Sequence, residues 1–324
     1  MKYILILLFL SCSTTQYLGG KRHKFNARAQ RVIWLQLAGW GSDLYPLIKF
    51  DGLDDKASLL ESMDSLGRIW SYSAQNLRSS AAESFFYQMN AKAYIDKDCS
   101  DLEKLPLFQS LVQEDFTLGF FQASKVEGLS PQDSIDCKSS WALRGSSQLY
   151  FWRSFPGVQQ KNPFHSERSI EFEPGLIYTD QSCSDKSCFK EKVENILVVY
   201  EKQMSKKKQS LFLIRDDSLL NVKKAKDLKE KLKEQIYLIN YFSELTKNDP
   251  NLLLLVTGAE AIGLKYPKKG NKWRLLDQNG SFLKFDEPRL DSSVLAIGAS
   301  SEIFSGLYRE QDIYFKLKWA IDGL

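Results

Sequence analysis

Residues 252–257 (LLLLVT) form a nearly continuous apolar run that leads directly into Gly258, Ala259 and Glu260. An apolar run of this length, bounded by turn residues, is typical of a strand that is buried on both faces. Pro250 stands just before the run and ends a long helical pattern, because proline cannot continue a helix. A helix that feeds a fully buried strand is characteristic of parallel sheets. The run therefore restricts the chain to folds with a buried, mostly parallel sheet.

Other apolar segments along the chain alternate with helical patterns. The longest helical pattern has apolar residues at steps of three and four, as one buried helix face requires. This alternation predicts an α/β fold, with a mostly parallel central sheet and helices on both faces. Ligands of such sheets bind beyond the carboxyl ends of strands, which directs attention to Gly39, Ser80 and Gly258. We expect strands at 31–38, 117–123, 210–215, 252–257 and 292–297, and helices at 80–91, 102–113, 189–204, 222–245 and from 311.

The first 29 residues are predicted to lie outside the fold. Residues 3–10 form an apolar run that is too short to span a bilayer as a helix but fits an export signal. Ser11 and Cys12 follow, and a small residue before a cysteine resembles a bacterial lipobox, in which Cys12 would be acylated. A cleaved, secreted chain and an uncleaved anchor are the alternatives. We expect a signal peptide over 1–11, a polar and basic tether over 12–29, and one domain over 30–324 with an aromatic-rich insertion around 146–186.

The composition argues against a disordered or membrane-embedded chain. Of the 324 residues, 43% are hydrophobic and 26% are charged, as in ordinary soluble globules. The net charge of +4 is small. Basic runs at 206–208 and 223–224 could suggest an anionic partner, and we interpret them as solvated surface. We expect no nucleic acid partner.

Four cysteines remain when Cys12 is set aside, which is an even number and fits an oxidising compartment. Cys183 and Cys188 are close enough in sequence to close a small loop, which would leave Cys99 with Cys137. Four cysteines allow three pairings, so this pairing is a preference. The chain has no C-x-x-C spacing that would indicate a zinc site.

Several short segments, taken together in their order along the chain, are specific enough to indicate a known protein family. Residues 37–41 (LAGWG) end the first strand, and residues 79–84 (SSAAES) begin a helix. Residues 118–131 lead from a strand to Ser-Pro, and residues 294–313 contain a strand followed by F-S-G and Q-D-I. In this order they resemble the D-G-x-G, D-S-A-A, A-T-P and F-x-G…N-T-D-I motifs of the alkaline phosphatase family. The resemblance covers nearly the whole mature chain and implies an alkaline-phosphatase-like sandwich.

The resemblance also implies a phosphate-ester hydrolase, but the matched positions mostly lack its metal ligands. In the family an activated serine attacks phosphorus beside two zinc ions and a magnesium ion, which Asp, His and Glu side chains hold. Ser80 matches the nucleophile, and Asp217 keeps the aspartate of one Asp…His pair. The other matched positions are Ala38 and Ser79 for two aspartates, Gly128 and Ser130 for magnesium ligands, Phe212 for the glutamate of E-G-x-x-x-D, Asn221 for the histidine that follows Asp217, Ala259 and Glu260 for an Asp-His pair, Glu287 for the last zinc histidine and Arg144 for the phosphate-binding arginine.

Histidine content supports this interpretation without depending on the alignment. The family site needs about three histidines for its zinc ions, and this chain has only His23, in the tether, and His165, in the predicted insertion. Without a metal or a histidine base the Ser80 hydroxyl is not activated, and Ser80 is interpreted as a helix N-cap. Close carboxylates repel one another unless a cation neutralises them, so a metal-free fold favours the loss of several together. We expect no metal cofactor.

The leading hypothesis is a catalytically inactive pseudoenzyme with a binding or envelope-associated role. Its expected location is the periplasmic side of a Gram-negative envelope, in the outer membrane through a lipid on Cys12, with a secreted or periplasmic chain as the alternative. An envelope protein is the expected partner. The alternative hypotheses are a phosphate- or sulfate-ester hydrolase that uses Ser80, Asp217 and Glu260 with zinc and magnesium, and a purely structural lipoprotein. The aromatic residues that would form a contact surface if exposed, and part of the core if buried, are Tyr150, Phe151, Trp152 and Phe155.

Overall fold

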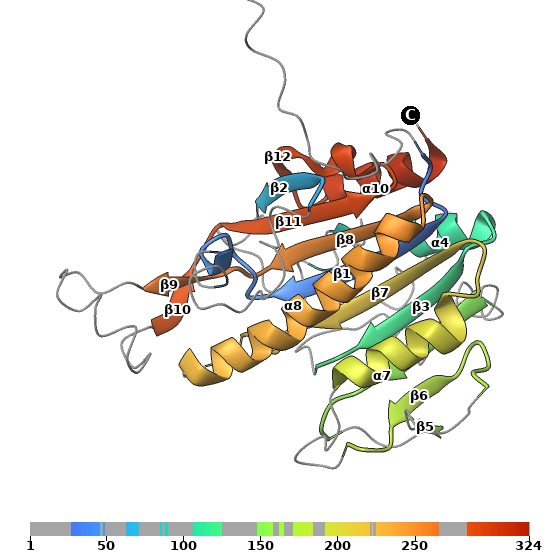
Figure 1. Ribbon diagram of the computed structural model, residues 1–324, viewed down its shortest axis with the longest axis horizontal. Coiled ribbons are helices and arrows are strands. Elements are labelled where there is room, and N and C mark those ends of the chain that lie inside the picture. The colour runs from blue at the N-terminus through green and yellow to red at the C-terminus, as the bar shows by residue number, and fades with distance from the viewer. Residues whose placement is uncertain are drawn as a thin grey trace, which may run out of the picture.

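A ten-stranded sheet forms the centre of the computed structural model (Figure 1). The structure describes residues 27–45, 48, 63–70, 85, 88–89, 106–124, 148–157, 162–164, 171–183, 192–220, 222, 225–265 and 284–323. In spatial order the strands of the sheet are β12 (Gly306–Arg309), β2 (Ser65–Trp70), β11 (Asp291–Gly298), β8 (Leu252–Ala259), β1 (Arg31–Ala38), β7 (Ser210–Asp216), β3 (Thr117–Gln122), β4 (Leu149–Arg153), β6 (Ile177–Asp180) and β5 (Pro163–Phe164).

The sheet is mostly parallel, as the alternation of strands and helices predicts. Only β11 among its described strands runs against its neighbours, β8 and β2. A separate two-stranded antiparallel sheet pairs β9 (Ile262–Lys265) with β10 (Lys284–Pro288). All strands of this sheet except β11 therefore point their carboxyl ends toward one edge of the sheet, which we call the carboxyl edge, and begin at the opposite, amino edge.

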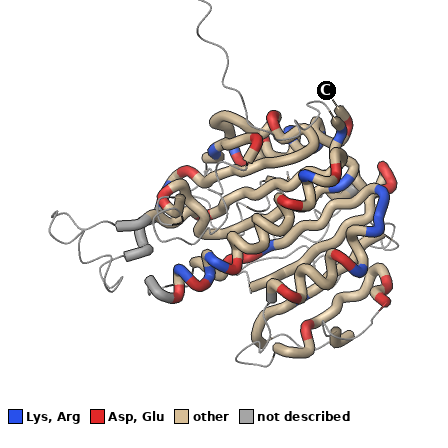
Figure 2. Tube along the Cα trace, viewed as in Figure 1, with Lys and Arg blue, Asp and Glu red and all other residues tan. Residues whose placement is uncertain are grey.

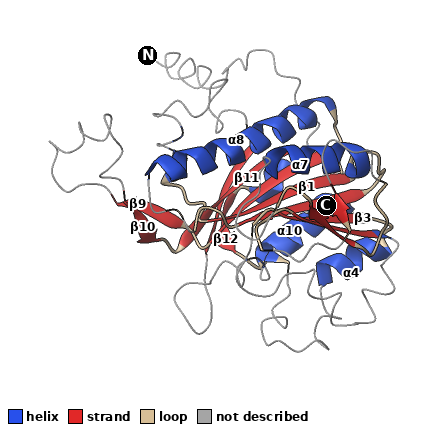
Figure 3. Ribbon diagram, turned by 90° about the horizontal axis from the view of Figure 1, so that it is seen from below, coloured by secondary structure: helices blue, strands red, loops and turns tan. Residues whose placement is uncertain are grey.

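Helices cover both faces of the sheet, which lies between them in Figure 3. One layer contains α7 (Lys192–Val199), its π-helical continuation η4 (Tyr200–Met204) and α8 (Ala225–Asn248). The other contains α4 (Pro106–Gln113) and α10 (Asp312–Asp322), which follows the short 3-10 helix η6 (Ser301–Phe304). None of the described helices has the combination of length and apolar character that crossing a bilayer requires.

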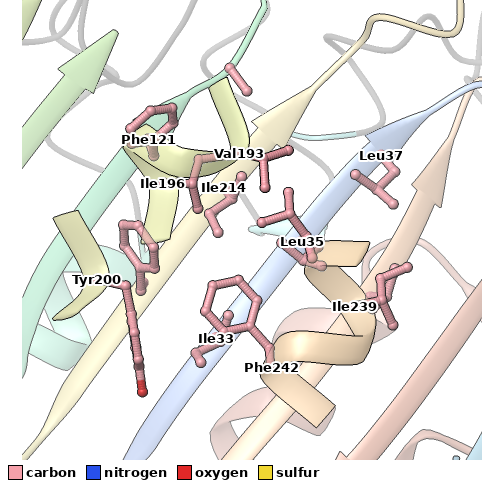
Figure 4. Packing of buried hydrophobic residues seen from close by; sticks show 14 of the residues in the cluster. Ile33, Leu35, Leu37, Phe121, Val193, Ile196, Tyr200, Ile214, Ile239 and Phe242 are labelled. Carbon is pink, nitrogen blue, oxygen red and sulfur yellow. The ribbon is translucent and has the colours of Figure 1, made fainter. Parts of the chain in front are cut away.

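Two hydrophobic clusters fill the space between the sheet and its helix layers. β1 contributes to both because its side chains alternate between the faces. Ile33, Leu35 and Leu37 pack on the α8 side, where Figure 4 shows them beside Ile239 and Phe242. Residues Val32 and Trp34 pack on the α10 side. This double burial explains why the central strands are nearly continuous apolar runs in the sequence.

Tyr200 of η4 is buried in the α8-side cluster and packs against the rings of Phe212 and Phe242. Burial raises the pKa of its hydroxyl to about 12 from an ordinary value of 10.0. A raised pKa in the folded state gives stability that is fully present below the unfolded value and is lost as pH rises toward the folded value. We expect Tyr200 to make folding less favourable by about 1–1.5 kcal/mol at about pH 11 than at about pH 9.

Urea unfolding of the wild type and of Tyr200→Phe at the two pH values isolates this effect, since other buried tyrosines are common to both proteins. The stability difference between wild type and variant is expected to shift in favour of the variant at the higher pH. A difference that does not change with pH would show that the Tyr200 hydroxyl ionises as easily in the folded chain as in the unfolded one.

The expected elements are confirmed where the apolar pattern is strong. The predicted strands at 31–38 and 252–257 are β1 and β8, although β8 continues through Ala259. The long helix begins at Ala225 rather than 222 and extends to Asn248. Of the expected helix at 80–91, only residues 85 and 88 are described as helical. The sequence did not predict β2, β9, β10 or β12.

The aromatic-rich segment around 146–186 is more regular than its sequence suggested. It supplies β4, β6 and β5, which extend the central sheet beyond β3. The aromatic residues considered for a contact surface lie on and just after β4 and are buried, so of the two alternatives stated for them the structure supports the core and excludes the contact surface. β4 lies between β3 and β6, and both of its faces are covered. The four residues concerned are Tyr150, Phe151, Trp152 and Phe155.

Candidate functional site

Three neighbouring strands define the candidate site. β1 lies between β7 and β8, all three run parallel, and their carboxyl ends meet at one edge of the sheet. In this register Ala38 pairs with Ala259, and Gln36 pairs with both Arg215 and Thr257. Side chains of residues paired in register point to the same face, which here is the α10 side. The two alanines at matched zinc-ligand positions are therefore neighbours.

An apolar cluster occupies the position where these two strands end. Ala38, Phe85 and Ala259 are buried together, and Leu220 packs against them. We call these four residues the apolar site cluster. Phe85 comes directly after the matched nucleophile segment 79–84 and five positions after Ser80, so this segment leads in the sequence to a residue that covers the strand ends. Methyl groups and an aromatic ring thus fill a place in which a metal site would need donor atoms.

A buried polar network lies beside the apolar site cluster. The Arg215 guanidinium donates from Nε and Nη2 to Oε1 of Gln36, at 3.1 and 3.0 Å. Gln36 in turn donates from Nε2 to Oε1 of Gln88, at 3.3 Å. The Thr257 hydroxyl donates to the same Gln88 oxygen at 2.7 Å, and Nε1 of Trp34 donates to the Thr257 hydroxyl at 2.9 Å. The network connects β7, β1 and β8 with residue 88.

Arg215 brings a permanent positive charge into this network. Its side chain is fully buried, and its guanidinium carbon lies 4.5 Å from the ring centre of Phe85 and 5.3 Å from that of Phe120. Arginine keeps its charge at every accessible pH, and aromatic faces attract cations at such distances. The charge therefore lies under Phe85, directly beside the apolar site cluster.

The structure places Phe212 and Arg215 on opposite faces of β7. Phe212, matched above to the glutamate of E-G-x-x-x-D, lies midway along β7 in the α8-side cluster, on the opposite face from Ala38. Arg215 instead lies near the carboxyl end of the strand on the site face.

Two acidic residues lie at the same edge of the sheet. Asp217 follows β7, is buried, and its backbone N–H donates to the Ser124 hydroxyl at 2.6 Å. Glu260 follows β8, is only partly buried, and has a left-handed backbone with φ 42°. Because β1 separates β7 from β8, the two residues lie on either side of β1. The predicted residue Glu287 lies on β10 and pairs with Gly263.

Turns with little room for side chains fix the positions of the strand ends at the carboxyl edge. Gly258 tolerates no Cβ, because that atom would overlap the backbone oxygen of Trp40. Gly39 has φ +82°, a left-handed conformation that favours glycine, and its backbone N–H donates to the oxygen of Ala259 at 2.8 Å. These contacts hold the ends of β1 and β8 together whether or not a ligand is present.

The described residues do not fit a zinc or magnesium site. Both metals need deprotonated oxygen, nitrogen or sulfur donors, and Ala38, Ala259 and Leu220 offer only methyl groups. Across the described ranges, no group of three or more His, Cys, Asp or Glu side chains could hold a metal ion. The Arg215 charge would also repel a dication placed nearby. The remaining predicted positions lie outside the described residues: Cys12, His23, Ser79, Ser80, Cys99, Gly128, Ser130, Cys137, Arg144, His165, Cys188 and Asn221.

The sequence reasoning missed the residues of the polar network. Gln36 and Arg215 are polar residues within strands that are otherwise apolar, which was the available signal. Gln88 and Phe85 gave no signal that separates them from other positions of a helical pattern.

These features define a class of protein, an α/β sandwich whose site lies at the carboxyl edge of central parallel strands. Its fold is that of the alkaline phosphatases, as the sequence motifs predicted. The structure is similar to alkaline phosphatase from the Antarctic bacterium TAB5, with 13% identity and a TM-score of 0.63 over 91% of this chain and 99% of that one.

Two further alkaline phosphatases show the same likeness. The cold-active enzyme from Shewanella sp. has 11% identity and a TM-score of 0.65, over 90% of this chain and 99% of that chain. The Thermus thermophilus enzyme has 10% identity and a TM-score of 0.60, over 95% of each chain. No family model matches the sequence, and no curated protein does. The likeness therefore concerns the fold.

Proposed function

We propose that this chain is an exported alkaline-phosphatase-like protein without catalytic activity, which has a binding or envelope-associated role. The observation that supports this proposal is the apolar site cluster, in which Ala38 and Ala259, both matched to metal ligands, pack with Phe85 and Leu220. A metal hydrolase of this fold uses its cations to activate the serine and to neutralise charge on the transferred group. The described part of this site supplies neither function.

The space beside Ala38 and Ala259 is filled by other side chains and is not left empty. Phe85 covers both alanines and at the same time stacks on the Arg215 guanidinium. The guanidinium is in turn hydrogen-bonded to Gln36, which connects to Gln88. Restoring one carboxylate at Ala38 or Ala259 would bury a charge among apolar groups, so a metal site could return only through several changes together.

Export and lipid attachment complete the proposal. The predicted signal precedes Cys12, and an acyl group there would tether the domain to the envelope through the polar segment that follows. Disulfides between Cys183 and Cys188 and between Cys99 and Cys137 fit that oxidising location. Cys183 is buried after β6, with its Sγ atom 3.5 Å from Oδ2 of Asp180.

Metal content and hydrolysis of an aryl phosphate test the proposal directly. We expect the purified mature chain, supplied with excess zinc and magnesium and then dialysed, to retain no stoichiometric metal. We also expect its hydrolysis rate to equal that of Ser80→Ala, because nothing activates the hydroxyl. Bound zinc at one or more ions per chain, together with activity that Ser80→Ala abolishes, would disprove the pseudoenzyme proposal.

An active hydrolase with a rearranged site is the second candidate. It is supported by the phosphatase activity named for the similar structures and by the location of Asp217 and Glu260 at the same edge. These two carboxylates and Ser80 would have to act with a metal or as general acid and base. The assay above separates this candidate from the first, and Asp217→Asn and Glu260→Gln would then identify the groups that act.

A further inference from the structure

The pair of strands β9 and β10, which we call the hairpin, is attached at the carboxyl edge but is not part of the central sheet. β9 follows β8 after Glu260 and Ala261, and β10 leads into β11 through Arg289 and Leu290. The two strands form a sheet of their own, which projects beyond the carboxyl ends of the central strands in Figure 1. A two-stranded sheet is only marginally stable by itself, so contacts with the rest of the fold must hold it in place.

The pairing within the hairpin is irregular, and the backbone at its root is strained. The register of β9 and β10 shifts between Phe285 and Glu287, and such a shift interrupts the ladder of hydrogen bonds. Glu260, which lies between β8 and β9, has a left-handed φ of 42°, a costly conformation for a residue other than glycine. Residues at the ends of elements that absorb a change in φ and ψ act as hinges. Both features favour movement of the hairpin relative to the sheet.

One ion pair connects the root of the hairpin to the turn that follows β1. Arg289 donates from Nε and Nη2 to Oδ2 of Asp43, at 3.0 and 2.6 Å. The Arg289 side chain is 37% exposed and that of Asp43 25% exposed, so water and salt screen the pair less than a fully exposed one. Hydrogen bonds between charged groups are stronger than those between neutral ones. We call this ion pair the latch.

A glycine makes room for the latch. A Cβ atom on Gly263 of β9 would lie 2.2 Å from Nε of Arg289 and 2.8 Å from Oδ2 of Asp43. Beside the latch, the Ile262 backbone N–H donates to the oxygen of Gly39 at 3.3 Å. Any side chain at residue 263 would therefore displace the ends of the two charged side chains.

The turn that the latch holds borders on the candidate site. Gly39, its first residue, follows Ala38 of the apolar site cluster. A Cβ atom on Gly41 would meet the methyl group of Ala261 at 3.4 Å, and Ala261 is fully buried. The root of the hairpin thus packs on the turn, and movement of the hairpin would uncover the carboxyl edge beside Ala38.

We propose that the hairpin opens and closes as a unit on the turn after β1, and that the Asp43–Arg289 latch keeps it closed. Opening would give a partner access to the backbone at the carboxyl edge, so the latch would regulate the binding role proposed above. This use of the opening rests on that proposed function, whereas the opening itself does not.

Hydrogen exchange of backbone amides, measured by mass spectrometry on the purified chain, tests the latch. We expect the amides of 262–265 and 284–288 to exchange faster than those of β1 and β8, because the hairpin opens without the sheet. Asp43→Asn and Arg289→Met are each expected to raise the exchange rate of the hairpin about five- to ten-fold, the effect of one partly exposed pair of charge-assisted hydrogen bonds. The rates in β1 and β8 should not change.

Further variants separate the latch from other effects of these substitutions. Because the latch is one interaction, Asp43→Asn combined with Arg289→Met should raise exchange no further than either change alone. Gly263→Ala keeps both charges but displaces them, and it should accelerate the hairpin in the same way.

The matched control is Lys231→Met. Lys231 pairs with Glu234 at 3.1 Å on the half of α8 where blue and red alternate in Figure 2, and the two side chains are 39% and 31% exposed. This variant removes an ion pair of similar exposure and should leave the exchange of the hairpin as in the wild type.

Hairpin amides that exchange as slowly as those of β1 and β8 would overturn the proposal, and so would latch variants that exchange as the wild type does. Faster exchange in β1, β8 and the hairpin together would also contradict it, since the ion pair would then stabilise the whole fold. These outcomes do not depend on metal content or hydrolysis, so they leave the function proposed above to its own test.

Discussion

Arg215→Ala is expected to lower the free energy of unfolding by about 3–5 kcal/mol. The substitution removes two hydrogen bonds to Oε1 of Gln36 and leaves that buried oxygen without those donors. It also removes the cation from beneath the Phe85 and Phe120 rings and leaves a cavity in the sheet edge. Urea unfolding followed by circular dichroism measures the loss.

Two further variants divide this effect into packing and charge. Arg215→Met keeps most of the volume but no donor, and we expect it to lose about 1–3 kcal/mol, because a buried polar group is then left unpaired. Arg309→Met is the matched control, since the Arg309 side chain is 74% exposed, and it should change stability by less than about 0.5 kcal/mol. An Arg215→Ala protein as stable as the wild type would show that the network contributes nothing to folding.

Ala259→Asp is expected to cost about 3–5 kcal/mol at neutral pH, or to prevent folding. The new carboxyl group would lie among Ala38, Phe85 and Leu220, whose side chains donate no hydrogen bond. Burial raises the pKa of such a group, and the nearby Arg215 guanidinium lowers it. We expect burial to be the larger effect, so the cost is present above the unfolded value near 4 and shrinks as pH falls toward it. Unfolding measured at about pH 5 and about pH 8 should therefore show the larger loss at pH 8.

Added zinc distinguishes a site that has lost most of its metal ligands from a site that lacks only the ligand at residue 259. We expect zinc to leave the melting temperature of Ala259→Asp unchanged, because the neighbouring side chains offer no second donor. Leu307→Asp serves as the control, since Leu307 is 60% exposed on the edge strand β12, and its loss should stay below about 1 kcal/mol. A zinc-dependent rise of several degrees in Ala259→Asp alone would mean that other ligands approach residue 259.

The central strands could be predicted from the sequence because both of their faces are buried. The long helix could be predicted because one continuous face of it is buried. β2 could not, since Leu66 and Trp70 alternate with buried positions and remain exposed on one side of an almost peripheral strand. β12 has four residues, all at least partly exposed, and so carries no apolar pattern. β4 was not predicted because its segment is rich in aromatic residues and lacks a clean periodicity, and we interpreted that segment as an insertion although the strand lies inside the sheet.

The residues of the candidate site that lie on paired strands could be placed from the sequence, because the register of the strands sets their neighbours. The residues that reach the site from a helical segment could not. The approach of Ala38 to Ala259 follows from two adjacent parallel strands that end together. Phe85 and Gln88 reach the site from a separate segment, and no local pattern states which face they meet. Arg215 is the last residue of the expected strand at 210–215, and the apolar pattern of that strand does not indicate that its side chain is directed into the core.

The guanidinium of Arg215 has a consequence for how the chain matures. A protein that depends on a bound ion folds only as far as the supply of that ion allows, and a chelator unfolds it. Here the positive charge at the strand ends is covalently part of the polypeptide, so it is present as soon as β7 is synthesised. On the metal-free site proposed above, such a domain would reach its final structure in an environment poor in metals.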